Sequence, residues 1–409
     1  MSIARLPDAA WRQSDGLKAV VTALWDGDEG PRIVGGAVRD SLLGATVSDI
    51  DLATKLHPEA VIDRLEAAGI KAIPTGFDHG TITAVALGQT FEITTLRRDV
   101  STDGRRATIE FSSDWQEDAA RRDFTINALY ADPVSGEIFD YFGGVEDLKT
   151  HRLRFIGDPV QRIAEDHLRT LRYFRFLARF GGEQVDHAAL SACAQSAKSL
   201  MALSRERIAS ELLKMLATPD PLFAVTLMIE NGIFASFMPE IADAANQSLQ
   251  RLIEREQANG IAVSISARLL SILPTDATIV DKVAMRLKLS NRMRVDLSNR
   301  LMSQNPDPDI IRAIAYHHDI ECARDGVMLF TDDAALQSCL DKLENWAVPV
   351  FQIKGGDLIK RGLTAGPVVA KTLKAIEAAW LKEGFPDTIR TNEIADQFVA
   401  GALLATKNA

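Results

Sequence analysis

A change of pattern at Asp158-Pro159 limits most strongly how this chain can fold. Before it, residues 30–157 hold short β-branched runs separated by Gly and Asp turns, which is typical of strands mixed with short helices. After it, apolar residues recur at helical spacing. Asp158 suits a helix N-cap and Pro159 a first helical residue, so we expect one long helix from there to about Phe180. The sequence therefore predicts an α/β head followed by an all-α remainder.

The composition is that of a globular protein and excludes several other classes. Of 409 residues, 46% are hydrophobic and 25% are charged, which excludes disordered, collagen-like and small disulfide-linked chains. No apolar run approaches the roughly 18 residues that span a membrane, and we expect no secretory signal. The three cysteines, Cys193, Cys322 and Cys339, are odd in number and far apart, which suits a reducing cytoplasm. Because the net charge is −10, any binding of nucleic acid must depend on local basic patches.

The most informative stretch combines a glycine turn with an acidic pair. A predicted strand ends in Gly35-Gly36 and continues into a helix with Arg39, so the backbone can approach a ligand closely and offer free N–H groups to an anion. Ten residues after Arg39 begins the pair Asp49 and Asp51, which point to the same face of a strand. Two adjacent carboxylates repel each other unless cations lie between them, and oxygen ligands suit Mg²⁺. Two such ions can clamp the attacking and leaving oxygens of phosphoryl transfer. Taken singly, the turn and the pair are also compatible with an ordinary turn and an exposed strand end.

A third carboxylate is available from Glu92, within the otherwise apolar and Thr-rich segment Phe91–Leu96. A lone Glu in such a strand needs a partner or a metal ion if it faces the interior. The alternative is a Glu on the solvent face of the strand, and the sequence leaves both open.

A second constellation is Arg121-Arg122-Asp123, followed by Asn127 in a moderately apolar segment. Guanidinium groups bind phosphates, and carboxylate and amide groups bind ribose hydroxyls. We therefore expect nucleotide binding here, with a solvated arginine pair as the alternative.

The third constellation lies in the predicted long helix, where Asp166, Arg169 and Arg172 share a face at i,i+3 spacing. Cytosine and adenine each offer an exocyclic amine donor beside a ring-nitrogen acceptor, and guanine and uracil offer the reverse. A carboxylate that accepts, next to a guanidinium that only donates, therefore suits C and A. Between Lys149 and Phe180 eight Lys or Arg stand against three acids, a local net charge of +5 that can meet phosphate. Ordinary helix-stabilising ion pairs are the alternative.

Together these stretches resemble class II tRNA nucleotidyltransferases, the CCA-adding enzymes and bacterial poly(A) polymerases of the DNA polymerase beta superfamily. The matching motifs are GGAVRD with DID after it, RRDFTINAL, and RLRFIGDP followed by EDHLRTLRYFR, within about the first 180 residues. The resemblance implies a head with a five-stranded mixed sheet at residues 1–148. It also implies a helical neck at 149–216, a helical body at 217–310 and a helical tail at 311–409 that binds the tRNA acceptor arm.

The resemblance also implies roles for single residues. Asp49 and Asp51 would hold two Mg²⁺ ions, with Glu92 as a further catalytic carboxylate. Asp166 and Arg169 would be the amino-acid template that reads the base. The residues that would bind the nucleotide, ATP or CTP, are Gly35, Gly36, Arg39, Arg122, Asp123, Asn127, Asp166, Arg169, Arg172 and Arg175.

Two features favour the CCA-adding members of this family over the poly(A) polymerases. Poly(A) polymerases usually carry an LVGRRF-like stretch after the acidic pair, whereas residues 74–81 here read PTGFDHGT. Members that add only CC have a shortened flexible loop, whereas the segment Arg97–Glu117 is not short. This segment is polar and contains Asp103-Gly104, so we expect it to be mobile without ligand. We expect full CCA addition, with poly(A) synthesis as the alternative.

The implied reaction is attack of the tRNA 3′-hydroxyl on the α-phosphate of CTP or ATP, with pyrophosphate leaving, in the cytoplasm and away from membranes. A nucleotidyltransferase for small molecules would not need so many helical residues after the head. An inactive RNA-binding relative would have damaged carboxylates, yet Asp49 and Asp51 are present. The dipeptide His318-Asp319 has no metal-spaced histidines before it, so we expect no phosphohydrolase domain.

Overall fold

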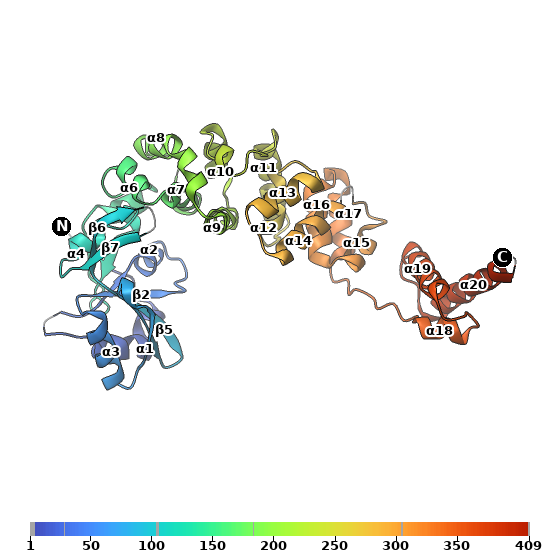
Figure 1. Cartoon of the computed structure of the whole chain (residues 1–409), viewed down its shortest axis with the longest axis horizontal. Coiled ribbons are helices and arrows are strands. Elements are labelled where there is room, and N and C mark those ends of the chain that lie inside the picture. The colour runs from blue at the N-terminus through green and yellow to red at the C-terminus, as the bar shows by residue number, and fades with distance from the viewer. Residues whose placement is uncertain (1–4, 28, 104–105, 183, 304–305, 408–409) are drawn as a thin grey trace. The chain divides into compact units, whose positions relative to one another are not determined.

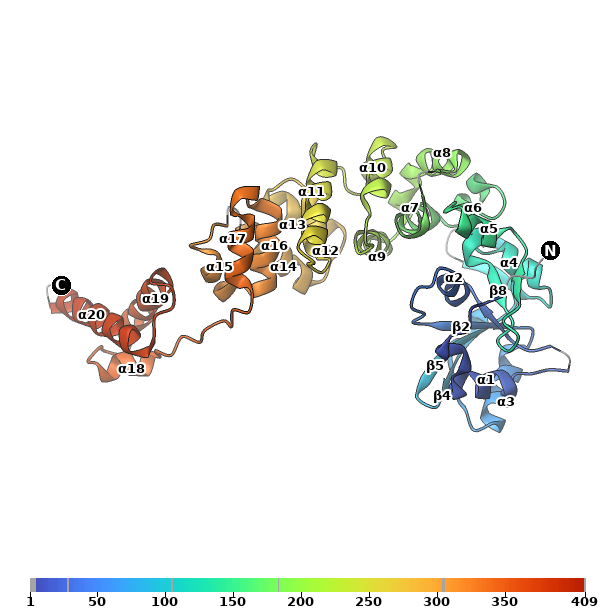
Figure 2. The ribbon, with the colours of Figure 1, turned by 180° about the vertical axis from the view of Figure 1, so that it is seen from behind.

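The computed structural model describes residues 5–27, 29–103, 106–182, 184–303 and 306–407, which form two compact units. The first unit holds Met1–Ile241 with Met285–Lys288, and the second holds Ala242–Ala284 with Leu289–Ala409. Figures 1 and 2 show the strands confined to the first unit and helices throughout the second. The predicted α/β head followed by helices is confirmed.

The head is built on a mixed sheet that has seven strands within the described residues, in the order β3-β4-β5-β2-β1-β8-β9. Strands β2 and β5 run parallel, and the other neighbours are antiparallel. The strands are β1 (Arg32–Val34), β2 (Ile50–Thr54), β3 (Lys71–Gly76), β4 (Thr81–Ala86), β5 (Gln89–Thr95), β8 (Leu129–Ala131) and β9 (Ile138–Asp140). The mixed sheet is confirmed, and its seven strands are two more than the five that the resemblance implied.

Helices cover the sheet and continue beyond it. Those of the head are α1 (Asp15–Ala23), α2 (Gly36–Leu42), α3 (Pro58–Ala67), α4 (Trp115–Ala120) and α5 (Gly144–Lys149), with 3₁₀ turns η1 (Ala10–Gln13), η2 (Phe77–His79) and η3 (Thr125–Asn127). The helices that follow are α6 (Pro159–Glu165), α7 (Leu168–Phe180), α8 (His187–Gln195), α9 (Arg205–Leu216) and α10 (Leu222–Glu230), with turns η4 (Ala197–Ala202) and η5 (Phe234–Ser236). Helix α7 packs against α9 and α10.

The long helix predicted from Pro159 to Phe180 is in fact two helices. Its start is confirmed: Asp158 accepts a hydrogen bond from the N–H of Gln161 at 2.8 Å, and Pro159 is the first helical residue. The chain then leaves the helix at Asp166, where φ is −148° and ψ is 105°. The Asp166 side chain accepts from the N–H of Leu168 at 3.1 Å. A short Asp side chain that bonds to nearby backbone competes with the helix, which explains a break that apolar spacing does not reveal.

The segment Arg97–Glu117, expected to be a loop, contains a β-hairpin. Strands β6 (Arg97–Asp103) and β7 (Arg106–Phe111) pair antiparallel, and β6 lies beside α4 (Figure 1). The central residues Gly104 and Arg105 lie outside the described residues. The strands were not expected because this polar segment shows no run of alternating apolar residues.

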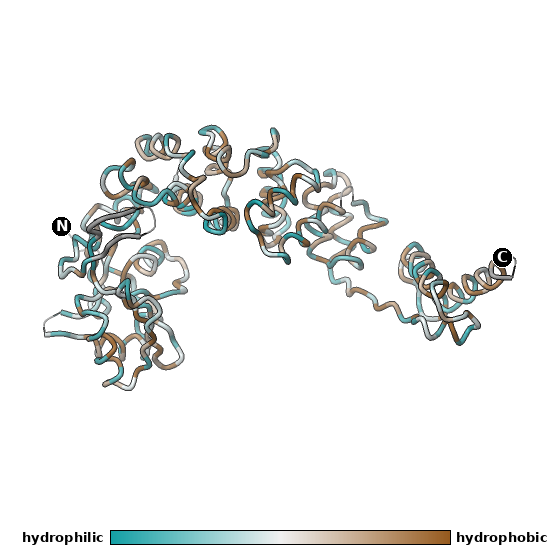
Figure 3. Tube along the Cα trace, in the orientation of Figure 1, coloured by the Kyte–Doolittle hydropathy of each residue, from teal (hydrophilic) through white to brown (hydrophobic). Residues whose placement is uncertain are grey.

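The second unit consists of helices. They are α11 (Ala245–Ala258), α12 (Ile265–Ser271), α13 (Ala277–Arg286), α14 (Asn291–Met302), α15 (Ile311–His317), α16 (Ile320–Phe330), α17 (Asp333–Leu343), α18 (Gly355–Lys360), α19 (Pro367–Lys382) and α20 (Thr388–Lys407). Figure 3 shows hydrophobic and hydrophilic residues alternating along them, as expected for helices that bury one face. Among the helices described, none combines the length and the apolar character that crossing a bilayer requires.

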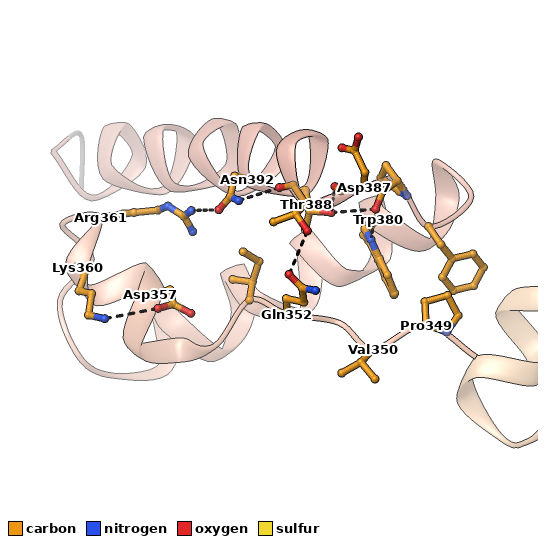
Figure 4. Close-up of a pocket in the computed structure, with 14 residues that line it drawn as sticks. Pro349, Val350, Gln352, Asp357, Lys360, Arg361, Trp380, Asp387, Thr388 and Asn392 are labelled. Atoms are coloured by element: carbon orange, nitrogen blue, oxygen red, sulfur yellow. Dashed lines mark hydrogen bonds and ion pairs between the residues drawn. The ribbon is translucent and has the colours of Figure 1, made fainter. Parts of the chain in front are cut away.

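The C-terminal helices α18, α19 and α20 enclose a pocket of about 540 Å³. Figure 4 shows polar groups converging on it from α20, from the segment before α18 and from the end of α18: the Thr388 hydroxyl donates to Gln352 at 3.2 Å, and Arg361, which directly follows α18, donates to Asn392. The Trp380 indole N–H donates to the carbonyl of Pro386 at 3.1 Å. The pocket belongs to the second unit, and the candidate site described below lies in the first.

Candidate active site

Three carboxylates gather at one face of the head sheet. Asp51 lies on β2 and is in register with Glu92 on the parallel strand β5, while Asp49 directly precedes β2. In-register residues of neighbouring strands project from the same face of a sheet. Burial, the Glu92 carboxylate and, less strongly, Asp49 raise the pKa of Asp51 to about 6, although Arg122 opposes them. The structure thus places Asp51 beside Glu92 on the neighbouring strand, and the Glu92 side chain is exposed, as in the solvent-facing alternative.

This acidic face has the chemistry of a cation site. Burial and like charges make the ionised form of Asp51 costly, and a divalent cation bound to its oxygens would remove that cost. Asp49 is exposed and accepts a hydrogen bond from the Ser48 hydroxyl at 2.9 Å. Across the part of the chain that the structure describes, no three His, Cys, Asp or Glu side chains are grouped tightly enough to hold an ion. The predicted binding of metal ions by Asp49 and Asp51, with Glu92 as their neighbour, stays a prediction.

The glycine turn is needed for its backbone conformation. Gly35 has φ of 68°, which residues with a side chain rarely adopt. Its N–H donates to the carbonyl of Leu129 at 2.9 Å. A Cβ atom at this position would lie 3.5 Å from the carbonyl oxygen of Asn127 and 3.7 Å from a guanidinium nitrogen of Arg122. The turn therefore lies directly against the second constellation.

A chain of hydrogen bonds joins the three sequence motifs. Arg39 on α2 donates to the Asn127 amide oxygen at 2.6 Å, and the Asn127 amide donates to Asp123 at 3.0 Å. The other oxygen of Asp123 accepts from Nε of Arg172 on α7 at 2.7 Å. Arg39, Asn127 and Asp123 are buried. Residues that are 49 and 88 positions apart along the chain are thus in direct contact.

The contacts of Asp123 favour its charged form. Burial disfavours its charge, but Arg172, the Asn127 amide and the backbone N–H of Phe124 outweigh burial and hold its pKa below the usual value. Both carboxylate oxygens already accept hydrogen bonds. The predicted contact of Asp123 with the ribose stays a prediction.

Arg122 is held by residues that the sequence analysis missed. It donates to Asp118 on α4 at 3.1 Å and to the Tyr130 hydroxyl at 3.0 Å, and that hydroxyl donates to Asp118 at 2.6 Å. Burial alone would raise the pKa of Asp118, but Arg122 and Arg121 lower it to about 2. The i,i+4 spacing of Asp118 and Arg122 was the available signal.

Asp166 and Arg169, the residues predicted to read the base, do not share a helix face as their spacing suggested. Asp166 lies between the end of α6 and the start of α7. Its carboxylate pairs with Arg207 on α9 at 2.8 Å. Arg169 pairs instead with Glu165 at 2.5 Å and donates to the carbonyl of Arg162 at 2.8 Å. Between the two predicted residues themselves, the backbone N–H of Arg169 donates to the Asp166 carbonyl at 2.9 Å. Arg207 was not foreseen, because 41 residues separate it from Asp166.

Arg175 completes the predicted set one turn further along α7. Its Nε lies 2.6 Å from a carboxylate oxygen of Glu211 on α9, and its guanidinium lies 4.3 Å from the ring centroid of Phe176. The guanidiniums of Arg39 and Arg172 each lie 5.4 Å from the same centroid. Three of the predicted phosphate-binding cations thus converge on one aromatic ring.

Comparison of the chain with known proteins identifies its family and several relatives. Residues 31–154 match the family model "Poly A polymerase head domain", and residues 184–245 match "Probable RNA and SrmB- binding site of polymerase A". The mouse protein "CCA tRNA nucleotidyltransferase 1, mitochondrial" is 35% identical over 91% of this chain and 87% of its own length. The "CCA-adding enzyme" of Lacticaseibacillus paracasei is 32% identical over 87% of this chain and 89% of its own length.

Solved structures agree with the fold. The crystal structure of the Bacillus stearothermophilus CCA-adding enzyme in complex with CTP matches with a TM-score of 0.71 and 26% identity, over 96% of this chain and 98% of the other. The Thermotoga maritima CCA-adding enzyme complexed with tRNA matches with a TM-score of 0.69 and 21% identity, over 97% and 99% of the two chains.

Proposed function

The chain belongs to the CCA-adding tRNA nucleotidyltransferases, which add C, C and A to the 3′ end of tRNA without a nucleic-acid template. We propose which residues of its site carry out this reaction. CTP and ATP supply the nucleotides, and pyrophosphate leaves. The observation that carries this proposal is the half-buried Asp51 carboxylate, which is in register with Glu92 and two residues from Asp49. The hydrogen-bonded chain from Arg39 to Arg172 belongs to the same head and neck.

The chemistry of the family is metal-dependent, and we assign two Mg²⁺ ions to Asp49 and Asp51. When bound, such ions polarise the reacting phosphate and stabilise the oxygens that attack and leave. Glu92 contributes negative charge to the same sheet face. The raised pKa of Asp51 supports the assignment, because its charge has no cationic partner strong enough to offset burial.

We assign the nucleotide to the residues of the hydrogen-bonded chain. Gly35 and Gly36 let the backbone of the turn approach the triphosphate, and Arg39 donates to it. Arg122 and Arg172 provide further guanidinium groups, each already held by a carboxylate. Because these groups are fixed before the substrate arrives, they contribute mainly by positioning and by electrostatic stabilisation.

We assign the choice of base to Asp166 and Arg169. The Asp166 carboxylate accepts two hydrogen bonds, from Leu168 and Arg207, and a carboxylate has about four acceptor sites. It therefore keeps capacity to accept from the exocyclic amine of C or A. Arg169, oriented by Glu165, supplies the donor for the ring nitrogen.

We propose a cytoplasmic location, which is supported by three buried cysteines that form no disulfide in the described chain. We also retain the division into neck (149–216), body (217–310) and tRNA-binding tail (311–409) as a proposal. The two compact units divide at Ile241, within the proposed body.

A stepwise incorporation assay tests the proposed function. The protein is incubated with tRNAs that end before CCA, after C and after CC, each with a single labelled nucleotide and Mg²⁺. We expect CTP to extend only the first two substrates and ATP only the third, with growth ending at A. Long A tails would instead identify a poly(A) polymerase, and tRNA binding without incorporation would identify an inactive relative.

A further inference from the structure

A carboxylate that no assigned role uses links α2 to α7. Asp40 follows Arg39 on α2 and accepts from its Nε at 2.8 Å. The other oxygen of Asp40 pairs with Arg179 at 3.2 Å, near the end of α7. Asp40 is 13% exposed, so most of its surroundings are protein and two guanidiniums share its charge.

An aromatic ring packs between the same two guanidiniums. Arg39 lies 4.2 Å and Arg179 lies 4.8 Å from the ring centroid of Phe180. A cation held over an aromatic ring and bonded to a carboxylate is restrained in both direction and distance. Asp40, Arg179 and Phe180 therefore restrict the positions that Arg39 can take.

Helix α7 contacts the head at two points that are two helical turns apart. Arg172 pairs with Asp123, and Arg179 pairs with Asp40 seven residues later. Between these points Arg39 donates to Asn127, and Asn127 donates to Asp123. The contacts therefore run from Arg179 on α7 through the head and back to Arg172 on α7. Arg179 and Arg39 are thus linked through the Asp40 carboxylate, and both guanidiniums also contact the Phe180 ring.

We propose that Arg179 is a positioning residue for the incoming nucleotide, acting through Asp40 to fix Arg39 against the triphosphate. The proposal rests on the assignment of Arg39 to the nucleotide. Arg179 is 45% exposed, and an ion pair of this exposure contributes little to folding stability. Its effect is therefore expected in the affinity for CTP and ATP.

The test compares Arg179→Ala with a matched ion pair elsewhere in the same unit. Arg152 is 48% exposed and pairs at 3.4 Å with Asp186, which is 15% exposed, so Arg152→Ala removes a bond of the same kind away from the site. We expect Arg179→Ala to raise KM for CTP and for ATP by about three- to tenfold, with kcat changed less than about twofold. Arg152→Ala is expected to leave these KM values unchanged, and Arg179→Lys to restore most of the loss.

A double-mutant cycle separates positioning from direct contact. In an Asp40→Asn background, Arg179→Ala is expected to change KM less than about twofold, because the link through the carboxylate is already broken. An undiminished effect of Arg179→Ala in that background would overturn the proposal, as would equal effects of Arg179→Ala and Arg152→Ala. Calorimetric titration of the same proteins with CTP keeps the test independent of turnover. If the wild type binds CTP but adds no nucleotide, the proposed function fails while this inference is still tested.

Discussion

Asp51 on β2 and Glu92 on β5 lie side by side on two neighbouring parallel strands, and Asp49 is close enough to raise the pKa of Asp51. We predict that Asp49→Ala or Asp51→Ala abolishes addition of both C and A, because both steps share one chemistry. Binding of tRNA, measured by gel shift, is expected to stay near the wild-type level. Retention of more than a few per cent of activity by either variant would contradict the assignment of the two ions.

The base-reading pair gives a second prediction at the residue scale. Asp166→Asn keeps the size of the side chain but replaces one acceptor oxygen by a donor. A mispaired buried hydrogen bond costs about 1–3 kcal/mol, so discrimination against U and G is expected to fall roughly ten- to a hundredfold. The ratio of kcat/KM for CTP to that for UTP measures this.

The matched control for Asp166→Asn must avoid Glu165, because Glu165 holds Arg169. Glu146→Gln serves better: it removes an exposed i,i+3 partner of Lys149 at 3.9 Å. An Asp166→Asn variant with the full wild-type preference would reduce Asp166 to a structural partner of Arg207.

Asp118, which holds Arg122, also gives a prediction for how the free energy of unfolding depends on pH. Its pKa is lowered from 3.8 to about 2, so the unfolded state binds the proton more tightly. The stabilisation, about 2 kcal/mol, is fully present above pH 4 and is lost as the pH falls toward 2. Asp118→Asn should therefore lower the free energy of unfolding at pH 7 and by progressively less below pH 4. Urea unfolding across this range measures it, with Asp8→Asn as the control, because Asp8 is a fully exposed carboxylate 3.6 Å from Arg12 and so represents a solvent-screened ion pair. A difference that does not change with pH would exclude this ion pair as its cause.

Single residues also show where sequence reasoning stopped. Asp49 and Asp51 were singled out because residues two apart on a strand share a face, and Glu92 because it stands alone in an otherwise apolar and Thr-rich segment. The neighbours Asp118 and Arg207 were not, since a long-range ion pair leaves no periodic signal.

At the scale of elements, the hairpin of β6 and β7 is the main difference from expectation. We predict that deleting residues 101–106 spares addition of C and impairs addition of A, because the resembled family uses this segment in the change of specificity. Extension of tRNAs ending in C and in CC measures the two activities separately. Equal loss of both would count against the role, provided that the deletion variant melts at the wild-type temperature.

The other element that differs is the helix that ends at Glu165. Its N-terminus was predictable because Asp158 and Pro159 are strong local signals. Its end was not, because the residues around Asp166 continue the helical pattern and only the bonds of that carboxylate interrupt it. The break places Asp166 outside a helix face, where it can bond to α9.

At the scale of the whole molecule, the order of an α/β head and a long helical remainder could be predicted from the change of sequence pattern at Asp158. The number of compact units did not, because helical periodicity shows which face of a helix is buried and not which helices pack together. The boundary at Ile241 falls inside a stretch of helices that look alike in sequence.

The length and sequence of the product test the central claim most directly. The protein is incubated with a tRNA that lacks its 3′ CCA, all four nucleotides and Mg²⁺, and the 3′ ends are sequenced. We predict products that end in C, C and A and grow no further, because the base-reading role that we propose for Asp166 and Arg169 admits only C and A. Products that carry long A tails, or that include U and G, would contradict it.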